Sequence, residues 1–148
     1  MKIRQATVQD ADALIDFNQA MALETEGRRL DPETIAAGVR AVFDGGGRGF
    51  YIVAEDEGAI VGGLMVTYEW SDWRNAWVWW IQSVYVIPEA RGRKLYSMMY
   101  SEVKERAAAA ENVCGFRLYV ESENTKAQNV YEKVGMERSH YLMYEEMN

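Results

Sequence analysis

A short basic loop in the middle of the chain separates an apolar run from an amphipathic helical pattern. The β-branched run ends at Pro88, and helical spacing begins near Leu95. Between them lie Arg91, Arg93 and Lys94. The backbone N–H groups of such a loop, and the positive end of the helix that follows, point toward a bound anion. This arrangement indicates a phosphate site, although a basic turn before a helix is about as often a solvated cap.

A second pattern follows a later apolar run and contains Asn124, Ala127, Tyr131 and Gly135, with Met136 next. Together the two segments resemble the GNAT superfamily of acyl-CoA-dependent N-acetyltransferases. Those proteins carry Val-x-Pro-x-x-Arg-Gly-x-Gly-x-Gly/Ala around the pyrophosphate loop and Asn-x-x-Ala-x-x-x-Tyr-x-x-x-Gly-Phe downstream. The resemblance covers essentially the whole chain, and it is closest in look to members that acetylate small amines such as polyamines.

The basic loop departs from the family pattern at two positions. Arg91 and Gly92 match, but Lys94 and Tyr96 stand where the family prefers small residues. Small residues there let backbone N–H groups approach the phosphates closely. A lysine side chain could instead reach the phosphates as a point charge. Some relatives carry an aromatic residue at the Tyr96 position, so we expect subfamily variation and not loss of binding.

The resemblance implies an α/β fold, the GNAT fold, in which a mixed central β-sheet is splayed between its fourth and fifth strands and flanked by about four helices. The whole chain, residues 1–148, is expected to form one such domain. Strands are predicted at residues 2–6, 50–55, 60–68, 77–86, 116–120 and 140–145. Helices are predicted after a Thr7/Asp10 capping box, after Asp31 with Pro32 at the first position, from residue 95 to about 110, and after Asn124.

Acetyl-CoA is the co-substrate that the resemblance implies. The backbone of the central strand, at Val84, Tyr85 and Val86, is expected to pair with the pantetheine arm and to polarise the thioester carbonyl. The expected pyrophosphate loop consists of Arg91, Gly92, Arg93, Lys94, Leu95, Tyr96 and Ser97. The residues expected on the pantetheine or adenosine side are Asn124, Asn129 and Tyr131, although Asn124 could equally be a simple helix N-cap.

Acetyl transfer to an amine requires a neutral amine and a proton for the departing thiolate. Tyr131 matches the tyrosine that protonates the CoA sulfur in many relatives; the alternative is a tyrosine that only packs its ring. Gln82 occupies the position where polyamine-acetylating relatives carry an acid, and it can hold the amine or a water but cannot accept the proton. Glu69 is the nearest acidic alternative, or else a solvent-facing charge. Because alkyl amines have a pKa of about 10.4, a water chain to bulk solvent is a third route.

The composition restricts the class of protein. The formal net charge is −7, a negative field that disfavours nucleic acid and favours cationic small molecules. No apolar run approaches the roughly 20 residues that a membrane span needs, and no signal-peptide core is present at the N-terminus. The single cysteine, Cys114, is expected in the core and suits a cytoplasmic protein. One histidine, His140, and no Cys/His cluster leave no metal ligand set.

These observations predict an N-acetyltransferase that moves an acetyl group from acetyl-CoA to the primary amine of a small metabolite, by direct transfer in a ternary complex. Two alternatives stay open: acetylation of a protein N-terminus or lysine, and a non-catalytic acyl-CoA-binding module. All five tryptophans lie between residues 70 and 80, where they could line the acceptor pocket, cover the core or form a dimer contact. A homodimer is expected because the family often dimerises; neither nucleic acid nor a membrane is an expected partner.

Overall fold

A five-stranded mixed β-sheet forms the centre of the larger part of the chain. The computed structural model describes all residues from 1 to 148, which form two compact units, residues 1–118 and residues 119–148. The strands, all in the first unit, are β1 (Lys2–Gln5), β2 (Phe50–Asp56), β3 (Ala59–Ser71), β4 (Ala76–Val86) and β5 (Val113–Arg117). They follow the order β1-β2-β3-β4-β5, and only the β4–β5 pair is parallel. The predicted α/β class with a mixed sheet is confirmed.

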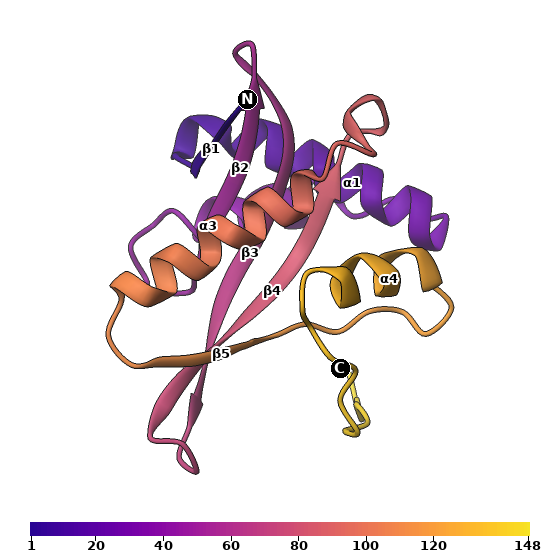
Figure 1. The fold of residues 1–148 in the computed structure, drawn as a ribbon. Coiled ribbons are helices and arrows are strands. Elements are labelled where there is room, and N and C mark those ends of the chain that lie inside the picture. The colour runs from indigo at the N-terminus through magenta and orange to yellow at the C-terminus, as the bar shows by residue number, and fades with distance from the viewer. The chain divides into compact units, whose positions relative to one another are not determined.

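Helices cover both faces of this sheet. The first unit contains α1 (Ala11–Glu26), α2 (Pro32–Ala41) and α3 (Leu95–Ala109). A Cβ built at Gly62 on β3 would meet Met99 of α3 at 3.6 Å, whereas one at Gly63 would meet Leu14 of α1 at 3.1 Å. Neighbouring residues of a strand face opposite sides, so α3 lies on one face of the sheet and α1 on the other (Figure 1).

β4 contains one residue more than the stretch of β3 that pairs with it. Gly63 pairs with Tyr85, but Met65 pairs with Gln82, so the register shifts between them. Ser83 has a φ of +53°, in the left-handed region. This is a β-bulge, which bends a strand and re-aims its side chains. As a result, Gln82 and Tyr85 face the same side of the sheet although they are three residues apart.

The sheet is splayed along β4. Trp77 to Trp80 pair with residues 113–117 of β5, and the pairing ends there. From residue 81 to residue 86, β4 has β3 along one edge and no strand along the other. The predicted gap between the fourth and fifth strands is therefore present, and it leaves main-chain groups of β4 open at that edge.

Two strand predictions were wrong, and so was the prediction that Cys114 lies in the core. β5 spans residues 113–117 instead of 116–120, because its pairing with Trp77–Trp80 determines its register. Cys114 accordingly lies within this edge strand and is exposed, with its Sγ donating to the Trp77 carbonyl oxygen at 3.4 Å. Residues 140–145 form no strand. A short apolar run such as this one favours a strand, but a strand forms only where a neighbour supplies hydrogen bonds.

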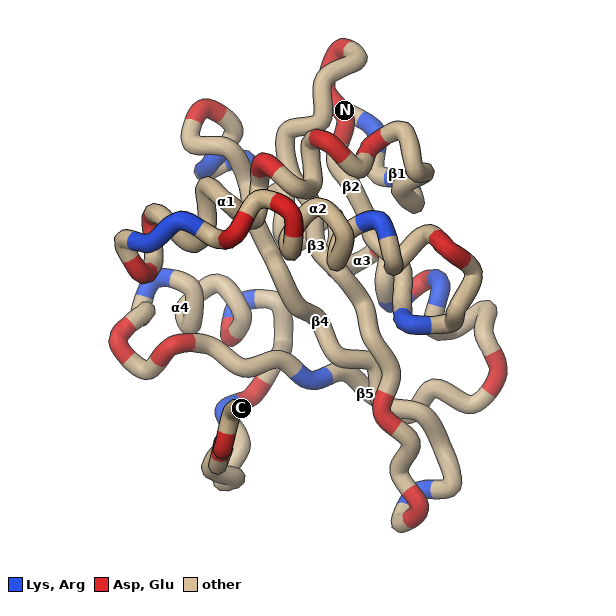
Figure 2. The backbone as a smooth tube through the Cα atoms, turned by 180° about the vertical axis from the view of Figure 1, so that it is seen from behind, with Lys and Arg blue, Asp and Glu red and all other residues tan.

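The charged side chains differ in how they are paired. Acidic residues outnumber basic ones by 23 to 16, and Figure 2 shows them spread over helices, loops and chain ends. Seven arginines form ion pairs with carboxylates, whereas no lysine does. None of the helices combines the length and the apolar content that crossing a membrane requires.

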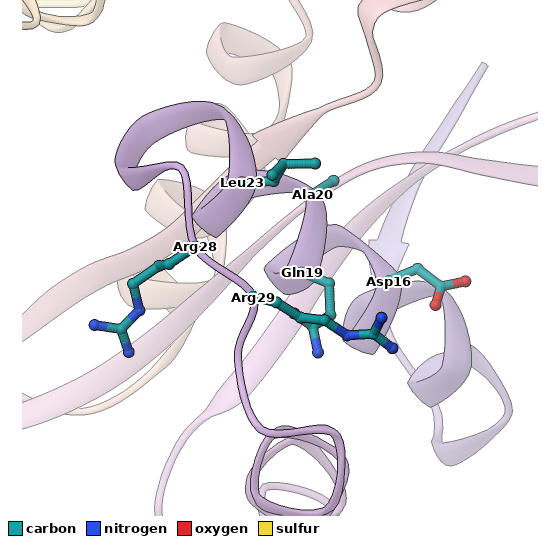
Figure 3. A pocket seen from close by; sticks show the side chains of 6 residues that line it. All are labelled: Asp16, Gln19, Ala20, Leu23, Arg28 and Arg29. Carbon is teal, nitrogen blue, oxygen red and sulfur yellow. The ribbon is translucent and has the colours of Figure 1, made fainter.

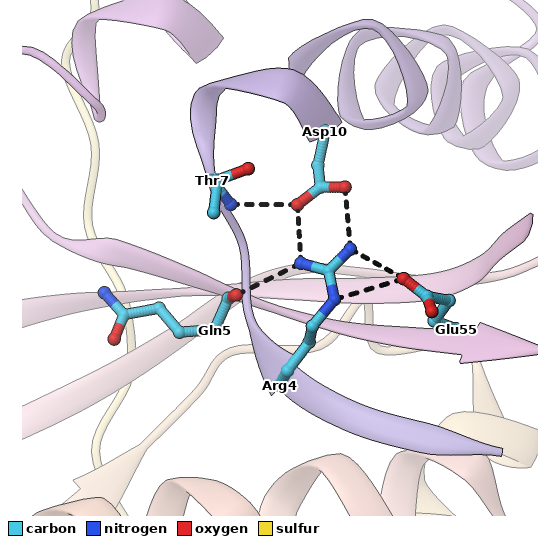
Figure 4. Close-up of polar contacts among 5 residues, drawn as sticks. All are labelled: Arg4, Gln5, Thr7, Asp10 and Glu55. Atoms are coloured by element: carbon cyan, nitrogen blue, oxygen red, sulfur yellow. Dashed lines mark hydrogen bonds and ion pairs between the residues drawn. The ribbon is translucent and has the colours of Figure 1, made fainter. Parts of the chain in front are cut away.

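An arginine on β1 ties three elements together (Figure 4). Arg4 donates to both carboxylate oxygens of Asp10, at 2.8 and 3.0 Å, and to Glu55 Oε1 on β2 at 2.9 Å. The Thr7 N–H donates to Asp10 Oδ2 at 2.8 Å, as the predicted capping box requires. Asp10 is buried, and the hydrogen bonds from Arg4 hold the pKa of its carboxyl below the ordinary value. The network fixes β1, β2 and the start of α1 relative to one another.

Replacing the buried carboxylate should destabilise the fold in a pH-dependent way. We expect Asp10→Asn to lower the free energy of unfolding by about 2 kcal/mol at pH 7, because hydrogen bonds to a charged partner are lost. Since the folded-state pKa of Asp10 is depressed, its contribution is complete above its unfolded pKa of about 3.9 and disappears as the pH falls through the folded value. Urea unfolding of both proteins from pH 7 to pH 2.5 measures this.

The matched control is Asp12→Asn, which breaks an exposed ion pair with Arg40. We expect this variant to change stability little at any pH. An equal loss in the two variants, or a loss in Asp10→Asn that does not shrink in acid, would contradict the structural role of Asp10.

Candidate active site

The loop before α3 presents main-chain donors that have no partner. The N–H groups of Gly92, Arg93, Lys94, Leu95 and Ser97 donate no hydrogen bond within the chain. The first N–H groups of a helix lack intrahelical acceptors and carry partial positive charge, so together they suit an anion. Five of the seven residues predicted as a phosphate site thus present main-chain donors without a partner, on one loop and one helix start.

The arginine side chains of this loop are engaged by acidic side chains. Arg91 contacts both carboxylate oxygens of Glu24 on α1, at 2.9 and 3.1 Å. Arg93 contacts Asp56 at the end of β2, at 3.1 Å. Lys94 makes no ion pair, so it is the loop cation whose charge is not already compensated by a carboxylate.

Lys94 occupies a backbone conformation that favours glycine. It is the N-cap residue of α3, with φ +60° and ψ +31°. Gly92, two residues earlier, has φ +81°. The loop therefore keeps a turn that suits the glycines of the family motif, and Lys94 adopts it at the cost of a left-handed non-glycine residue. At the position where the sequence departs from the family motif, the structure therefore has a strained backbone and an ammonium group without an ion-pair partner.

The main chain of β4 is fixed at its end but open before it. The Val86 carbonyl oxygen accepts a hydrogen bond from Arg91 Nε at 2.9 Å, and the Ile87 N–H donates to the Val61 carbonyl oxygen of β3 at 3.0 Å. Val84 and Tyr85 lie between this anchor and the bulge at Ser83, on the edge that no strand covers. The backbone predicted to pair with pantetheine is thus free of a strand partner on that edge.

The two predicted catalytic side chains of the sheet lie on one face. Gln82 Nε2 donates to Thr67 Oγ1 at 2.6 Å, which leaves the amide oxygen of Gln82 as an acceptor. Glu69, next on the same face of β3, accepts from Trp80 Nε1 and from Arg117, each at 2.8 Å. The hydrogen bond from Trp80, and then that from Arg117, lower the pKa of Glu69. A carboxylate held ionised in this way attracts a cation well but accepts a proton poorly.

The second unit contains the other predicted motif, on and around helix α4 (Thr125–Lys133). Asn124 is the N-cap, and its Oδ1 accepts from the Ala127 N–H at 3.1 Å, so the simple N-cap interpretation is confirmed. Gly135 ends the helix with φ +99°. Tyr131 is half-buried, and burial raises the pKa of its hydroxyl, which therefore keeps its proton at neutral pH. Asn129 is exposed.

The five tryptophans differ in burial and in their contacts. Trp79 is buried in the sheet, and Trp80 donates to Glu69 on the polar face. Trp70 and Trp77 pack edge to face, with ring centroids 5.0 Å apart, and both are partly exposed. Trp73, at the tip of the β3–β4 hairpin, is 89% exposed. The hairpin therefore carries an apolar surface that the first unit does not cover.

A separate cavity of about 390 Å³ lies along α1 (Figure 3). Its lining residues are Asp16, Gln19, Ala20, Leu23, Arg28 and Arg29. Gln19 holds the segment between α1 and α2, since its side chain accepts from the Leu30 N–H and donates to the Leu30 carbonyl oxygen, both at 2.8 Å. None of the predicted site residues lines this cavity.

Three residues of the site were not selected from the sequence: Glu24, Thr67 and Arg117. Each acts by contacting a selected residue, respectively Arg91, Gln82 and Glu69. For Glu24 a signal existed, because it stands seven residues after Phe17 and so on the same face of a helix. For Thr67 and Arg117 the register of β3, β4 and β5 was needed. No cluster of three or more His, Cys, Asp or Glu side chains suited to a metal ion is found.

The sequence and the fold were compared with those of known proteins. The pattern that defines the Acetyltransferase (GNAT) family matches residues 12–136. A solved structure described as a possible acetyltransferase from Clostridium difficile 630 is 40% identical, with a TM-score of 0.90 over 99% of this chain and 97% of that one. No curated protein matches the sequence.

More distant structures share the fold. An integron cassette protein from the mobile metagenome of Cole Harbour Salt Marsh is 19% identical, with a TM-score of 0.86 over 98% of this chain and 89% of its own. A ribosomal-protein-alanine N-acetyltransferase from Brucella melitensis biovar Abortus 2308 is 12% identical, with a TM-score of 0.80 over 99% and 98%.

The chain belongs to the GNAT family of acetyltransferases. It is therefore an acyltransferase, and the family it belongs to generally uses acetyl-CoA.

The left-handed backbone of Lys94 should affect the stability of the fold, which substitutions at this position can test. Lys94→Gly and Lys94→Ala both remove the ammonium group, but only glycine also relieves the left-handed conformation. We expect Lys94→Gly to unfold with a free energy about 1 kcal/mol higher than Lys94→Ala. Denaturant unfolding of the two variants measures the difference with charge held constant. Equal stability would show that residue 94 carries no backbone strain.

Proposed function

We propose that this chain is a cytoplasmic N-acetyltransferase that moves an acetyl group from acetyl-CoA to the primary amine of a small metabolite. One observation carries the proposal: unpartnered N–H groups, those of Gly92, Arg93, Lys94, Leu95 and Ser97, lie one short turn after a strand, β4, whose edge is open beyond Trp80. A phosphate and a peptide-like arm are what these two features suit. Acetyl-CoA joins both in one molecule.

The donor would be held mainly by main chain. In our proposal the pantetheine amides pair with the β4 edge at Val84, Tyr85 and Val86. The pyrophosphate lies against the N–H groups of residues 92–95 and 97. Lys94 is the cation available to the phosphates, because it has no carboxylate partner. The thioester would then lie near the bulge at Ser83, where the strand's main chain is re-aimed.

The acceptor would bind on the polar face of β3 and β4. The Gln82 amide oxygen can accept an N–H of the amine, since Thr67 takes the other end of the amide. Glu69 attracts the ammonium form, and its lowered pKa makes it a weak base. We therefore propose that the excess proton of the amine leaves to solvent, not to a dedicated carboxylate.

We propose direct transfer in a ternary complex. The amine nitrogen attacks the thioester carbonyl carbon, the C–S bond breaks, and the departing thiolate takes a proton from the Tyr131 hydroxyl. An acyl-cysteine route is not supported. Cys114 lies beside Trp77, and Ser83 is six residues farther along β4, or about 20 Å at strand spacing.

A homodimer stays a prediction. It is supported by the exposed aromatic side chains of the β3–β4 hairpin, Trp70, Trp73 and Trp77. Aromatic residues are enriched at interface cores.

An amine panel tests the proposed function. Acetyl-CoA is offered with polyamines, free amino acids, a lysine peptide and peptides with free N-termini, and released CoA thiol and acetylated product are measured. We expect a higher kcat/KM with one of the small amines than with any peptide. Faster turnover of peptides would favour protein acetylation. Binding of acetyl-CoA without amine-dependent thiol release would favour the non-catalytic module.

Removing one oxygen atom tests the role of Tyr131. We expect Tyr131→Phe to lower kcat by at least about 10²-fold, because general acids contribute on that scale, with affinity for acetyl-CoA nearly unchanged. Tyr141→Phe, which removes the same atom from an exposed tyrosine of the same unit, is the control and should keep full activity. A kcat of Tyr131→Phe within about threefold of the parent would falsify the acid assignment.

A further inference from the structure

Glu24, near the end of α1, contacts two residues of the proposed donor site. Its carboxylate accepts from the Tyr85 hydroxyl at 3.0 Å and from Arg91 at 2.9 and 3.1 Å. The other side of Arg91 donates to the Val86 carbonyl oxygen. One carboxylate and one guanidinium thus join α1, the last residues of β4 and the start of the basic loop.

Tyr85 is held by two contacts to its ring and by a hydrogen bond from its hydroxyl. Its ring packs against Phe17 of α1 with centroids 5.3 Å apart, and the Arg91 guanidinium carbon lies 5.4 Å from its centroid. The side chain is buried. It reaches α1 only because the bulge at Ser83 turns it to that side of the sheet. The side chain of Tyr85 therefore fixes the backbone edge that is proposed to meet pantetheine.

These contacts argue against a direct role for Arg91 at the phosphates. Its Nε donates to Val86 and its Nη2 to both carboxylate oxygens of Glu24, so that its charge is compensated by a carboxylate at 2.9 Å. An arginine that served the phosphates would gain nothing from this partner, because Glu24 would compete with the anion. Glu24 and Arg91 together add no net charge beside the loop.

We infer that Glu24 is a positioning residue, which through Tyr85 and Arg91 holds the end of β4 and the basic loop in the geometry that binds the donor. This inference rests on the proposed use of acetyl-CoA at this loop. The competing interpretation, in which Arg91 binds pyrophosphate as a free cation, predicts effects of the opposite sign.

The experiment measures the dissociation constant of CoA for the full chain and five variants, with Arg91→Gln among them. We expect Glu24→Gln to weaken CoA binding about fivefold, as loss of an exposed but multiply bonded pair allows. Tyr85→Phe, which changes no charge, should weaken it in the same direction. The double variant Glu24→Gln/Arg91→Gln should bind CoA no more weakly than the weaker-binding of Glu24→Gln and Arg91→Gln, because both single changes remove the same ion pair.

Glu26→Gln is the matched control, since it removes one negative charge from the same exposed end of α1 without breaking a contact. If Arg91 were a phosphate cation, Glu24→Gln would bind CoA more tightly than the parent, the double variant would approach the parent, and Tyr85→Phe would not differ from it. Any of these results overturns the inference. If the unmutated chain did not bind CoA, the proposed function itself would be contradicted.

Thermal unfolding of each variant separates positioning from general loss of structure. All binding is measured well below the lowest unfolding temperature. A positioning role predicts weaker CoA binding in Glu24→Gln with an unfolding temperature close to that of Glu26→Gln. Weaker binding that simply followed a lower unfolding temperature across all variants would contradict it.

Discussion

The extra residue of β4 is the constraint on which the site depends. Without it, strict alternation would turn Tyr85 away from the face that bears Gln82. With it, Tyr85 reaches α1 and the polar acceptor face lies next to the open strand edge. The bulge puts Ser83 at φ +53°, a conformation that costs a non-glycine residue about 1–2 kcal/mol. Burial of the Tyr85 ring beside Phe17 contributes free energy that offsets the cost of this conformation.

Main-chain groups, more than side-chain charges, define the expected donor site. The loop is strongly basic in sequence, yet the charges of its two arginines are compensated by Glu24 and Asp56. What remains is a row of N–H groups at a helix start and one lysine. An anion held in this way is recognised by dipoles of fixed direction, which lose little on binding because they need no reordering. A loop whose N–H groups already point at the anion therefore contributes more to binding affinity than additional charged side chains would.

Much of the fold could be predicted because it follows from local rules. Caps at Thr7 and Asp31, the proline after Asp31, and the alternation of β4 as far as Gln82 each act within a few residues of sequence. The wrong predictions have a different origin. The register of β5 depends on which residues of β4 pair with it, and the apolar run at residues 140–145 does not specify a partner strand.

The residues of the candidate site also differ in whether local sequence or tertiary contacts determine them. Loop residues and the capping role of Asn124 were accessible from spacing, since both are local. The partners that decide what the selected residues can do were not, because Glu24 is 67 residues away from Arg91 and Arg117 is 48 residues away from Glu69. Those distant partners change the chemistry: Glu24 compensates the charge of Arg91, and the hydrogen bond from Arg117 helps to lower the pKa of Glu69. A motif therefore names the residues of a site, while the tertiary partners assign their roles.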